Sequence, residues 1–369
     1  MHTTDTLVLG AGPSGLAVGA CLRKAGVAFE LLERGPSVGT AWRNHYDRLH
    51  LHTARAFSAL PHRPFPAGAP QFVPRLQVVQ YLEDYAREFQ LTPVVGADVT
   101  RVARGTDWTV TLRDGRTFAS KNVVIATGYN RVPFRPTWPG TFDGLLLHSS
   151  EYRNGAPFAG QRVLVVGIGN TGGEIALDLL EHGAVPTLAV RSPVVVIPRE
   201  VLGQPSQATA IRMGRLPIRA RDWIGRVISR VTFGDLSRYG LGRPSIGPAT
   251  MVSRGRIPLI DIGTIGAIKS GAITVTPGLE RFDGDAVVFT DGSRRPFDAI
   301  VLATGYRPGL HDFLECAPSV TNAAGYPSHW NATAKVPGLY FLGFVNPATG
   351  FLREIALEAP RIAAHIAQP

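Results

Sequence analysis

The sequence predicts an α/β fold made of two similar units, because three features occur twice along the chain. An apolar strand runs into a glycine loop of the form GxGxxG at 6–15 and again at 162–172. Each loop is followed by an apolar stretch compatible with a helix. Each unit then closes on an apolar strand that ends in Ala-Thr-Gly-Tyr, at 126–129 and at 303–306. One GxGxxG alone is a weak signal, but two in this context indicate two Rossmann-like dinucleotide-binding domains.

The elements between these landmarks repeat in the same order. In the first unit we expect a helix at 16–25, a second strand at 29–33 and a hairpin turn at 114–115. In the second unit we expect a helix at 174–181, a second strand at 187–191 and a hairpin turn at 291–292. The two turns are Asp-Gly pairs between alternating apolar residues, a pattern typical of a β-hairpin. We therefore expect a strand–helix–strand arrangement with a small antiparallel meander in each half.

The first glycine loop fits the adenosine end of FAD. Gly10 permits the tight turn, Gly12 lets the backbone approach a pyrophosphate, and Gly15 lets the helix pack closely on the sheet. The N–H groups at the start of that helix are free to bind phosphate. Glu33 ends the second strand, where a carboxylate accepts hydrogen bonds from ribose hydroxyls. The first site is therefore predicted to bind FAD.

The second site differs at the corresponding point. Its second strand ends in Arg191 and Ser192, with no acidic residue. A guanidinium beside a hydroxyl suits a 2′-phosphate, which a carboxylate would repel. The second site is therefore predicted to bind NADPH, and a plain surface arginine is the alternative interpretation of Arg191.

The order of the landmarks predicts that the second domain interrupts the first. We expect an FAD-binding domain in two parts, 1–144 and 269–369, and an NADPH-binding domain at 145–268. The residues expected to bind the two cofactors are Gly10, Gly12, Ser14, Gly15, Glu33, Arg34, Trp42, Ala126, Thr127, Gly128, Gly167, Gly169, Asn170, Thr171, Gly172, Arg191, Ser192, Ala303, Thr304, Gly305 and Asn346.

Composition narrows the class of protein. With 44% hydrophobic and 18% charged residues among 369, the chain can form a sizeable core and is not a disordered or fibrous protein. Its two cysteines, Cys21 and Cys316, form no disulfide framework, redox pair or thiolate metal site, so we expect no metal and a reducing cytoplasm. No apolar run is long enough to span a membrane, and a first strand that starts by Leu7 leaves no room for a signal peptide.

The net charge of +10 comes from 34 arginines and only four lysines, a ratio that indicates a coding bias rather than a nucleic-acid partner. The segment 211–231 is the exception, because arginines alternate there with apolar residues as in a basic amphipathic helix. We expect a solvated helix that covers the cofactor cleft. Docking on an anionic membrane surface is the alternative that we do not favour. The oligomeric state is left open.

The segment 142–152 carries a longer motif, FxGxxxHxxx(Y/W), with Phe142, Gly144, His148 and Tyr152 at its fixed positions. Through this motif the chain resembles the class B flavin-dependent monooxygenases. A Tyr at the last position of the motif resembles the pattern of the flavin-containing monooxygenases, whereas a Trp at that position is typical of Baeyer–Villiger enzymes. We expect His148 to be structural and to orient the linker between the two domains.

Within this class the chain most resembles the plant YUCCA-type enzymes, which convert indole-3-pyruvate to indole-3-acetic acid. The segments that carry the resemblance are 42–52, 60–66, 81–86, 190–192, 197–203, 239–244 and 261–263. The similarity extends from Leu7 to about residue 366. It implies the two-domain fold and the use of both FAD and NADPH.

The resemblance also implies a mechanism. NADPH reduces FAD, and reduced FAD reacts with molecular oxygen to give a C4a-hydroperoxyflavin that transfers one oxygen atom to a small organic substrate. Such a species lasts only in a dry, closed site. His52 is expected to bond the flavin or a pocket water, Asn170 to contact nicotinamide or the peroxide, and Arg353 to neutralise a substrate carboxylate. The alternatives are a packed structural histidine for His52, a turn former for Asn170 and a surface residue at a helix start for Arg353.

Two substrate classes stay open. A 2-oxo acid such as indole-3-pyruvate would be oxidatively decarboxylated, whereas an amine or thioether of secondary metabolism would be oxygenated at nitrogen or sulfur. The segment 344–355, expected beside the substrate, differs from the plant pattern. A pyridine-nucleotide disulfide reductase shares the architecture but needs a redox cysteine pair. A binding protein with decayed cofactor sites is disfavoured because both glycine loops are intact.

Overall fold

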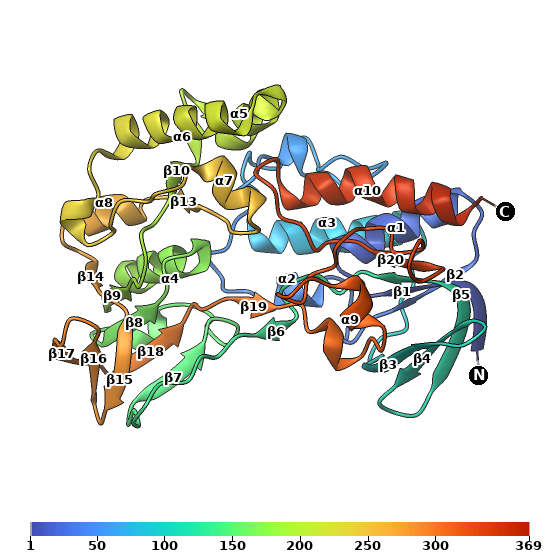
Figure 1. The fold of residues 1–369 in the computed structure, drawn as a ribbon, viewed down its shortest axis with the longest axis horizontal. Coiled ribbons are helices and arrows are strands. Elements are labelled where there is room, and N and C mark those ends of the chain that lie inside the picture. Colours follow the sequence, from blue (N-terminus) through green and yellow to red (C-terminus); the bar gives the residue numbers. More distant parts are fainter. Residues whose placement is uncertain (1, 369) are drawn as a thin grey trace.

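Two β-sheets lie at opposite ends of an elongated molecule in the computed structural model, which describes residues 2–368 (Figure 1). The first sheet has the strand order β2-β1-β5-β4-β3, and β20 pairs with β5 as well. Its strands are β1 (His2–Leu9), β2 (Phe29–Leu32), β3 (Val99–Arg104), β4 (Trp108–Leu112), β5 (Thr117–Ile125) and β20 (Leu339–Phe341). Strands β3, β4 and β5 form the antiparallel meander that the first Asp-Gly turn predicts.

The second sheet has the order β14-β9-β8-β18-β7, and all its neighbours are parallel. Its strands are β7 (Leu145–His148), β8 (Arg162–Val166), β9 (Val185–Ala189), β14 (Thr274–Thr276) and β18 (Ala299–Leu302). The second Asp-Gly turn lies in a separate three-stranded sheet of β15 (Leu279–Asp283), β16 (Ala286–Phe289) and β17 (Arg294–Pro296).

The two sheets repeat one arrangement, which confirms the predicted α/β fold with two Rossmann-like domains. In the first sheet β1 lies between β2 and β5, and all three strands are parallel. In the second sheet β8 lies between β9 and β18 in the same way. The strand before each glycine loop is therefore flanked by the strand that precedes Ala-Thr-Gly. This places both motifs at the carboxyl ends of neighbouring strands, where open α/β sheets bind ligands.

The expected return to the first domain at residue 269 does not fit the pairing of the strands. Strands β14 and β18, both after residue 269, belong to the second sheet. The chain returns to the first unit only after Leu302, through β19 (Tyr306–Arg307), which pairs with β6 (Val132–Pro133). The error arose because the Ala-Thr-Gly strand closes its own unit in both copies, so residues 269–302 complete the second sheet.

Each glycine loop leads directly into a helix. Helix α1 (Pro13–Lys24) packs against α3 (Arg75–Glu88) and α10 (Phe351–Ile366), and their apolar faces share one core that includes Leu16, Leu82 and Ile355. Helix α4 (Asn170–Glu181) packs against α8 (Thr264–Lys269) over a second core that includes Ile175 and Ile265. Both helices begin a few residues before the expected 16–25 and 174–181, because the glycine loop itself forms the first turn.

A long excursion between β9 and β14 adds a helical layer along one edge of the molecule (Figure 1). It contains β10 (Val196–Pro198), β11 (Glu200–Val201), β12 (Gln204–Pro205), α5 (Ser206–Arg212), α6 (Ile218–Phe233), α7 (Pro248–Ser253) and β13 (Leu259–Asp261). Two short helices, α2 (Thr40–Arg43) and α9 (Ala317–Val320), belong to the first unit. Within residues 2–368, none of the helices has both the length and the apolarity needed to cross a membrane.

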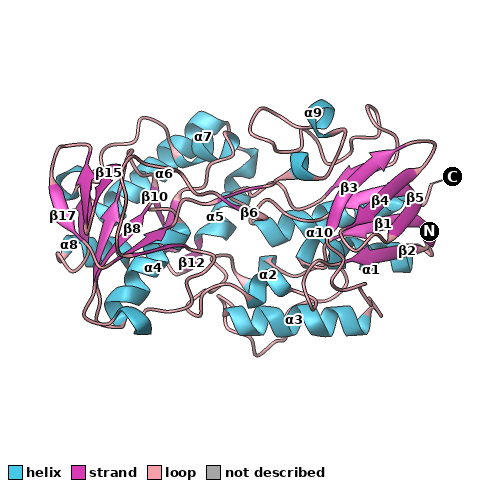
Figure 2. Cartoon of the chain, turned by 90° about the horizontal axis from the view of Figure 1, so that it is seen from below, coloured by secondary structure: helices cyan, strands magenta, loops and turns pink. Residues whose placement is uncertain are grey.

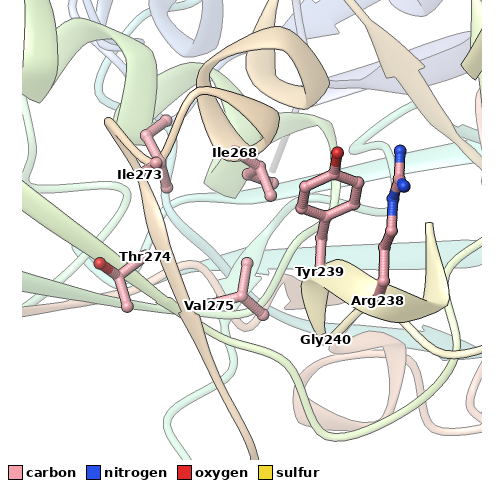
Figure 3. A pocket seen from close by; sticks show the side chains of 8 residues that line it. Arg238, Tyr239, Gly240, Ile268, Ile273, Thr274 and Val275 are labelled. Carbon is pink, nitrogen blue, oxygen red and sulfur yellow. The ribbon is translucent and has the colours of Figure 1, made fainter.

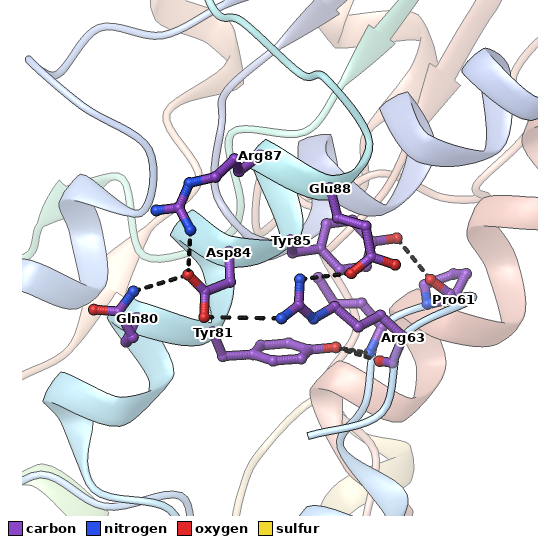
Figure 4. A network of polar contacts seen from close by, with 9 residues as sticks. Pro61, Arg63, Gln80, Tyr81, Asp84, Tyr85, Arg87 and Glu88 are labelled. Carbon is purple, nitrogen blue, oxygen red and sulfur yellow. Dashed lines mark hydrogen bonds and ion pairs between the residues drawn. The ribbon is translucent and has the colours of Figure 1, made fainter. Parts of the chain in front are cut away.

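A polar network fixes the segment 61–63 on helix α3 (Figure 4). The Tyr81 hydroxyl donates to the Arg63 carbonyl at 2.7 Å, and the Tyr85 hydroxyl donates to the Pro61 carbonyl at 2.8 Å. The Arg63 guanidinium in turn bonds Glu88 at 2.7 Å. Buried tyrosines usually find such a partner for the hydroxyl. The network holds in place the end of the 52–63 segment, whose beginning reaches the second unit.

The motif at 142–152 attaches β7 to the second sheet. The His148 ring is fully buried and bonds the carbonyl of Gly305 at 3.1 Å, which ties the edge strand to the second Ala-Thr-Gly turn. The buried Tyr152 hydroxyl donates to the carboxylate of Asp178 on α4 at 2.6 Å. Burial is the largest cause of a raised Tyr152 pKa, and the bond to Asp178 adds to it. The motif is therefore a structural joint between the linker, the sheet and α4.

Replacing Tyr152 with Phe should destabilise this joint. The substitution leaves the buried Asp178 carboxylate without its hydroxyl donor, which costs about 1–3 kcal/mol. Urea unfolding followed by far-UV circular dichroism measures the loss. Tyr326→Phe is the matched control. Burial alone raises the Tyr326 pKa, with no contribution from a hydrogen bond, so this variant removes a hydroxyl without removing such a bond. Equal stability of the two variants would show that the Tyr152–Asp178 bond does not support the fold.

Candidate active site

The two glycine loops have the same backbone geometry. Gly10 and Gly167 have φ values of +107° and +106°, a region that favours glycine. A Cβ atom on Gly10 would lie 2.8 Å from the carbonyl oxygen of Ala126, and one on Gly167 would lie 2.8 Å from that of Ala303. In both units the first glycine is therefore needed because the Ala-Thr-Gly strand passes directly beside it.

The third glycine of each loop allows the helix to meet the turn. A Cβ on Gly15 would lie 1.7 Å from the Gly10 carbonyl oxygen, and one on Gly172 would lie 2.0 Å from that of Gly167. No side chain fits at such a distance, so backbone contacts backbone. This close contact sets the start of α1 and α4 at the carboxyl edge of each sheet.

The middle glycine of each loop faces free space. A Cβ added to Gly12 or Gly169 meets no atom within 4 Å, and both residues have an extended backbone at the start of a helix. Here glycine is not required by the protein's own packing. Space at a helix N-terminus is what a dinucleotide pyrophosphate needs. The loops therefore fit the groups that the sequence predicts for them.

Glu33 lies at the carboxyl end of β2, beside the first loop. Its carboxylate accepts hydrogen bonds from the N–H groups of Ala11, at 2.7 Å, and Gly35, at 2.6 Å. These bonds fix the carboxylate next to the glycine turn while leaving the side chain partly accessible. Arg34 follows and is exposed. The arrangement suits a ribose whose hydroxyls donate to Glu33.

The two Ala-Thr-Gly turns differ in their threonines. The Thr127 hydroxyl is buried and has no hydrogen-bond partner among residues 2–368. An unpaired buried hydroxyl costs free energy, and a cofactor along the strand ends would supply a partner. The Thr304 hydroxyl instead donates to the Phe134 carbonyl at 2.5 Å and so holds the segment that crosses between the units. Thr127 is therefore available to a ligand, whereas Thr304 has a structural bond.

Arg191 and Ser192 follow β9 and are both exposed. Among the described residues Arg191 forms no ion pair with an acidic side chain, and Gly278 makes room for it, since a Cβ there would lie 2.9 Å from the Arg191 Cβ. The guanidinium is therefore free to meet an anion at the edge where the second dinucleotide would lie. This is the environment that a 2′-phosphate requires.

Asn170 opens helix α4, and part of its amide is already engaged. Its side-chain oxygen accepts the N–H of Ile260 in β13 at 2.7 Å. The bond joins the second glycine loop to the excursion. Only the NH₂ end of the amide is left for a ligand, a constraint that the sequence does not reveal.

A buried polar cluster joins the two units beside the second loop. Glu174 on α4 is 2% exposed and bonds the Nε2 atom of His52, which comes from the first unit. Tyr46 also reaches Glu174 and Thr171, and burial, followed by the charge of Glu174, raises the Tyr46 pKa well above its usual value. Burial lowers the pKa of the neighbouring His45 to about 4, so this ring is neutral at physiological pH.

His52 has one nitrogen on Glu174, and its other nitrogen, Nδ1, is buried with no partner among residues 2–368. Trp42 lies in the same part of the first unit, half-buried, with its ring 6.1 Å from that of His45. His52 thus comes from the first unit and contacts α4 just after the second glycine loop. A buried nitrogen without a partner, like the Thr127 hydroxyl, marks a place for a ligand.

The C-terminal segment approaches the first Ala-Thr-Gly-Tyr turn. Asn346 donates to the hydroxyl of Tyr129 at 2.8 Å, and the rings of Tyr129 and Phe351 meet edge to face at 5.4 Å. Burial raises the Tyr129 pKa to about 12. Ser14 is also buried here. Gly343 passes close to it, since a Cβ on Gly343 would lie 2.1 Å from the Ser14 hydroxyl. The segment thus lies close to the first glycine loop.

Arg353 lies in the first turn of α10 and already has an acidic partner. Its guanidinium bonds the carboxylate of Glu354 at 3.0 Å, and Glu354 also accepts the Thr349 hydroxyl at 2.6 Å. The Arg353 side chain is 30% exposed. A substrate carboxylate would have to share the guanidinium with Glu354.

Gln207 on α5 connects three segments that lie far apart in the sequence. It is 5% exposed, accepts the N–H of Ala54 at 2.9 Å and donates to the Thr349 carbonyl at 2.7 Å. Gly350 allows this approach, since a Cβ there would lie 2.3 Å from the Gln207 amide nitrogen. The excursion is thereby attached to the 52–58 loop and to the segment before α10.

A surface hollow of about 380 Å³ lies beside the edge strand β14, lined among others by Arg238, Tyr239, Ile268 and Thr274 (Figure 3). Thr274 begins β14, whereas the opposite end of that strand, Thr276, pairs with Ala189 beside Arg191. The hollow therefore lies at the amino end of the strand, away from the dinucleotide edge. It is not part of the candidate active site.

Comparison with known proteins agrees with this geometry. The sequence family described as pyridine nucleotide-disulphide oxidoreductase matches residues 7–200. An indole-3-pyruvate monooxygenase of rice, YUCCA4, is 40% identical over 98% of this chain and 87% of its own. Among solved structures, a flavin-containing monooxygenase from Stenotrophomonas maltophilia has a TM-score of 0.74 at 24% identity, with 99% of each chain covered. A cyclohexanone monooxygenase has a TM-score of 0.77 at 20% identity, with 100% of this chain and 88% of that chain covered.

The chain therefore belongs to the class B flavin-dependent monooxygenases. Within that class it is similar to the YUCCA-type enzymes, and it is an FAD- and NADPH-dependent monooxygenase, as the sequence predicts. A disulfide reductase is excluded by its cysteines. Cys21 and Cys316 are both free, and burial raises the pKa of the Cys21 thiol to about 12, which keeps it protonated and unreactive.

Sequence reasoning missed several residues that the structure brings to the site. Glu174, Tyr46 and Gln207 all act through contacts between segments more than 100 residues apart in the chain. Glu174 directly follows the second glycine loop, and an acidic residue in the apolar start of a helix was a signal that could have identified it. Gln207 has no comparable signal, because an isolated glutamine in a polar helix is ordinary.

The middle and third glycines of the first loop should behave differently when substituted. Gly12→Val puts its side chain into the free space expected for the pyrophosphate, so the protein folds but loses FAD. Gly15→Ala forces a side chain against the Gly10 carbonyl, which costs about 1–3 kcal/mol or more of stability. Thermal unfolding and flavin absorbance separate the two effects. A Gly12→Val protein that retains its full flavin absorbance would refute the first assignment.

Arg191→Ala should weaken the use of NADPH far more than that of NADH. Loss of a charge-assisted bond of about 1.5–3 kcal/mol raises the KM for NADPH roughly 10- to 150-fold. NADH lacks the 2′-phosphate and serves as the internal control. The measurement is the initial rate of NAD(P)H oxidation by the flavin-loaded protein. Equal changes for both nucleotides would place Arg191 away from the 2′-phosphate.

Proposed function

We propose that the chain is an oxidative decarboxylase of a small 2-oxo acid such as indole-3-pyruvate. The observation that carries the proposal is the 40% identity, over 98% of this chain, to an enzyme named for that substrate. The overall reaction consumes the 2-oxo acid, O₂, NADPH and a proton, and yields the acid shortened by one carbon, CO₂, NADP⁺ and water. When bound, FAD supplies the electron transfer from NADPH and the activation of oxygen.

The protein's part is to bind, orient and exclude water. We assign Glu33 to the ribose of FAD, the first helix start to its pyrophosphate, and Arg191 to the 2′-phosphate of NADPH. We assign His52 to the flavin through Nδ1, since Nε2 is held by Glu174. We assign the NH₂ group of Asn170 to the nicotinamide side, because its oxygen is held by Ile260.

We place the substrate between the first Ala-Thr-Gly-Tyr turn and the start of α10. Tyr129, Asn346 and Phe351 line this place, and Arg353 supplies the cation for a carboxylate. Gln207 supports the position of the segment by bonding Thr349. A guanidinium that binds a carboxylate in two places orients the adjacent keto carbon.

One observation favours a second candidate function, the oxygenation of an amine or thioether. The charge of Arg353 is already compensated by Glu354 at 3.0 Å, an arrangement that a neutral substrate would leave undisturbed. The same oxygen donor serves both reactions, so the difference lies in the charge that the pocket accepts. Molecular oxygen and a small organic molecule are the partners in either case.

We also place the protein in the cytoplasm. Both cysteines are free, and one of them is buried with a raised pKa, which agrees with a compartment that keeps thiols reduced.

A substrate screen tests the proposal directly. NADPH oxidation is measured with indole-3-pyruvate, with amines and with thioethers, and each product is identified by mass. A product that is one carbon shorter, formed in a fixed ratio to the NADPH consumed, supports the 2-oxo acid. A product that gains one oxygen atom at nitrogen or sulfur, together with an inert 2-oxo acid, supports the alternative.

Arg353→Met separates the two substrate classes by charge. If Arg353 binds the carboxylate, turnover of 2-oxo acids falls by roughly 10- to 150-fold, while NADPH oxidation continues and releases hydrogen peroxide instead of product. Peroxide and product are quantified against the NADPH consumed. The matched control is Arg361→Met, farther along the same helix. An unchanged product yield in Arg353→Met would end the carboxylate hypothesis.

A further inference from the structure

Helix α6 has two faces of opposite character. Its inner residues, Asp222, Gly225 and Phe233, are buried, and a Cβ on Gly225 would lie 2.4 Å from the Pro248 ring of α7. Its only acidic residue, Asp222, points inward and accepts the N–H groups of Ala249 at 2.8 Å and Thr250 at 3.0 Å. The outer face of α6 therefore contains no carboxylate.

The outer face carries an exposed apolar row. Trp223, Val227 and Val231 follow each other at intervals of four residues, so they lie on one side of the helix. Trp223 is 67% exposed and Val231 is 81% exposed. Val227, between them, is 42% exposed. Single exposed apolar residues are ordinary, but a row of three that begins with an indole is not.

A second row, of arginines, runs beside the first. Arg219, Arg226 and Arg230 are exposed at spacings of seven and four residues, and Arg212 and Arg215 precede them in the chain. Among residues 2–368, the carboxylate that pairs with this row is Asp235 after the helix, which lies 3.5 Å from Arg230 and also bonds Arg243. The face is therefore apolar in one row and strongly positive in the next. Figure 1 shows α6 on the outer edge of the molecule, away from both sheets.

We infer that the outer face of α6 docks the monooxygenase on an anionic lipid surface, the alternative that the sequence alone did not favour and that the exposed rows of α6 now support. A helix with a large apolar row and a basic row lies in the plane of such a surface, with its apolar side chains at the acyl boundary and its cations near the lipid phosphates. Trp prefers the level of the headgroups. Long arginine side chains reach the phosphates from the flank of the helix. The docking is peripheral and reversible.

Two other occupants fit this face less well. A second copy related by two-fold symmetry would place the same arginine row against itself, which is repulsive. A nucleic acid matches the charge, but it offers no apolar layer for Val227 and Val231. A lipid surface satisfies both rows at once, and this is why we select it. The inference does not depend on which substrate the enzyme oxidises.

Co-sedimentation of the flavin-loaded full chain with vesicles tests the inference. The expected result is binding to vesicles of equal parts phosphatidylglycerol and phosphatidylcholine, weak binding to phosphatidylcholine alone, and release by salt. Combined Arg215→Gln, Arg219→Gln and Arg226→Gln should lower the partition coefficient on the order of 100-fold, since each cation contributes roughly fivefold. Val231→Ser should weaken binding without altering its dependence on salt.

The matched control removes the same charge elsewhere. Arg87→Gln, Arg101→Gln and Arg113→Gln replace three exposed arginines of the first unit that are paired with Asp84, Glu315 and Asp98. This control should bind vesicles as the unmodified protein does, and both triple variants should retain NADPH oxidation. Equal losses in both triple variants would reduce the effect to net charge and overturn the inference. Absence of vesicle binding, or a dimer in sedimentation velocity that only the α6 variant abolishes, would overturn it as well.

Discussion

The whole molecule depends on a contact of backbone with backbone that occurs twice. At the third glycine of each loop, the space for a Cβ is already taken by the carbonyl of the first glycine, at 1.7 Å in one unit and 2.0 Å in the other. This contact lets a helix start immediately at the carboxyl edge of the sheet. The N–H groups of that helix then face a space that the middle glycine leaves open. One steric requirement thereby produces two helix starts on one chain that suit an anion.

The two sites are useful together only if their relative position is fixed, and the chain fixes it in several ways. Strands β6 and β19, which lie on the two segments that connect the units, pair with each other. Thr304 bonds the Phe134 carbonyl in the first connecting segment, and His148 bonds the Gly305 carbonyl at the start of the second. Glu174 of the second unit is buried against His52 of the first. A buried carboxylate is costly to leave without its partner, so this contact resists separation of the two units. Hydride transfer between two bound dinucleotides needs such a fixed geometry.

The sequence was most informative where function depends on local backbone geometry. The repeat predicted both glycine loops, both second strands and the closing strands, because glycine spacing and short apolar runs directly report turns and buried strands. It misplaced residues 269–302, since strand pairing between distant segments has no local signal. It also could not show that the Asn170 oxygen is held by Ile260 or that Gln207 joins Ala54 to Thr349. These contacts depend on the excursion between β9 and β14, whose path is set only by the finished fold.

The same repeat also shows how one backbone serves two purposes. Gly10 and Gly167 differ by one degree in φ. A Cβ on either residue would lie 2.8 Å from the carbonyl oxygen of the Ala in the neighbouring Ala-Thr-Gly turn. The side chains on that shared backbone nevertheless diverge. Glu33 directly follows β2, whereas the equivalent place after β9 is taken by Val190 and the cation Arg191 comes one residue later. The Thr127 hydroxyl, which has no partner among residues 2–368, corresponds to that of Thr304, which bonds Phe134. The shared backbone geometry therefore fits a dinucleotide in both units, and we propose that a few side chains at the strand ends select which dinucleotide binds. The place that we propose for the substrate, at the start of α10, belongs to neither copy of the repeat, so a change there would leave both glycine loops undisturbed.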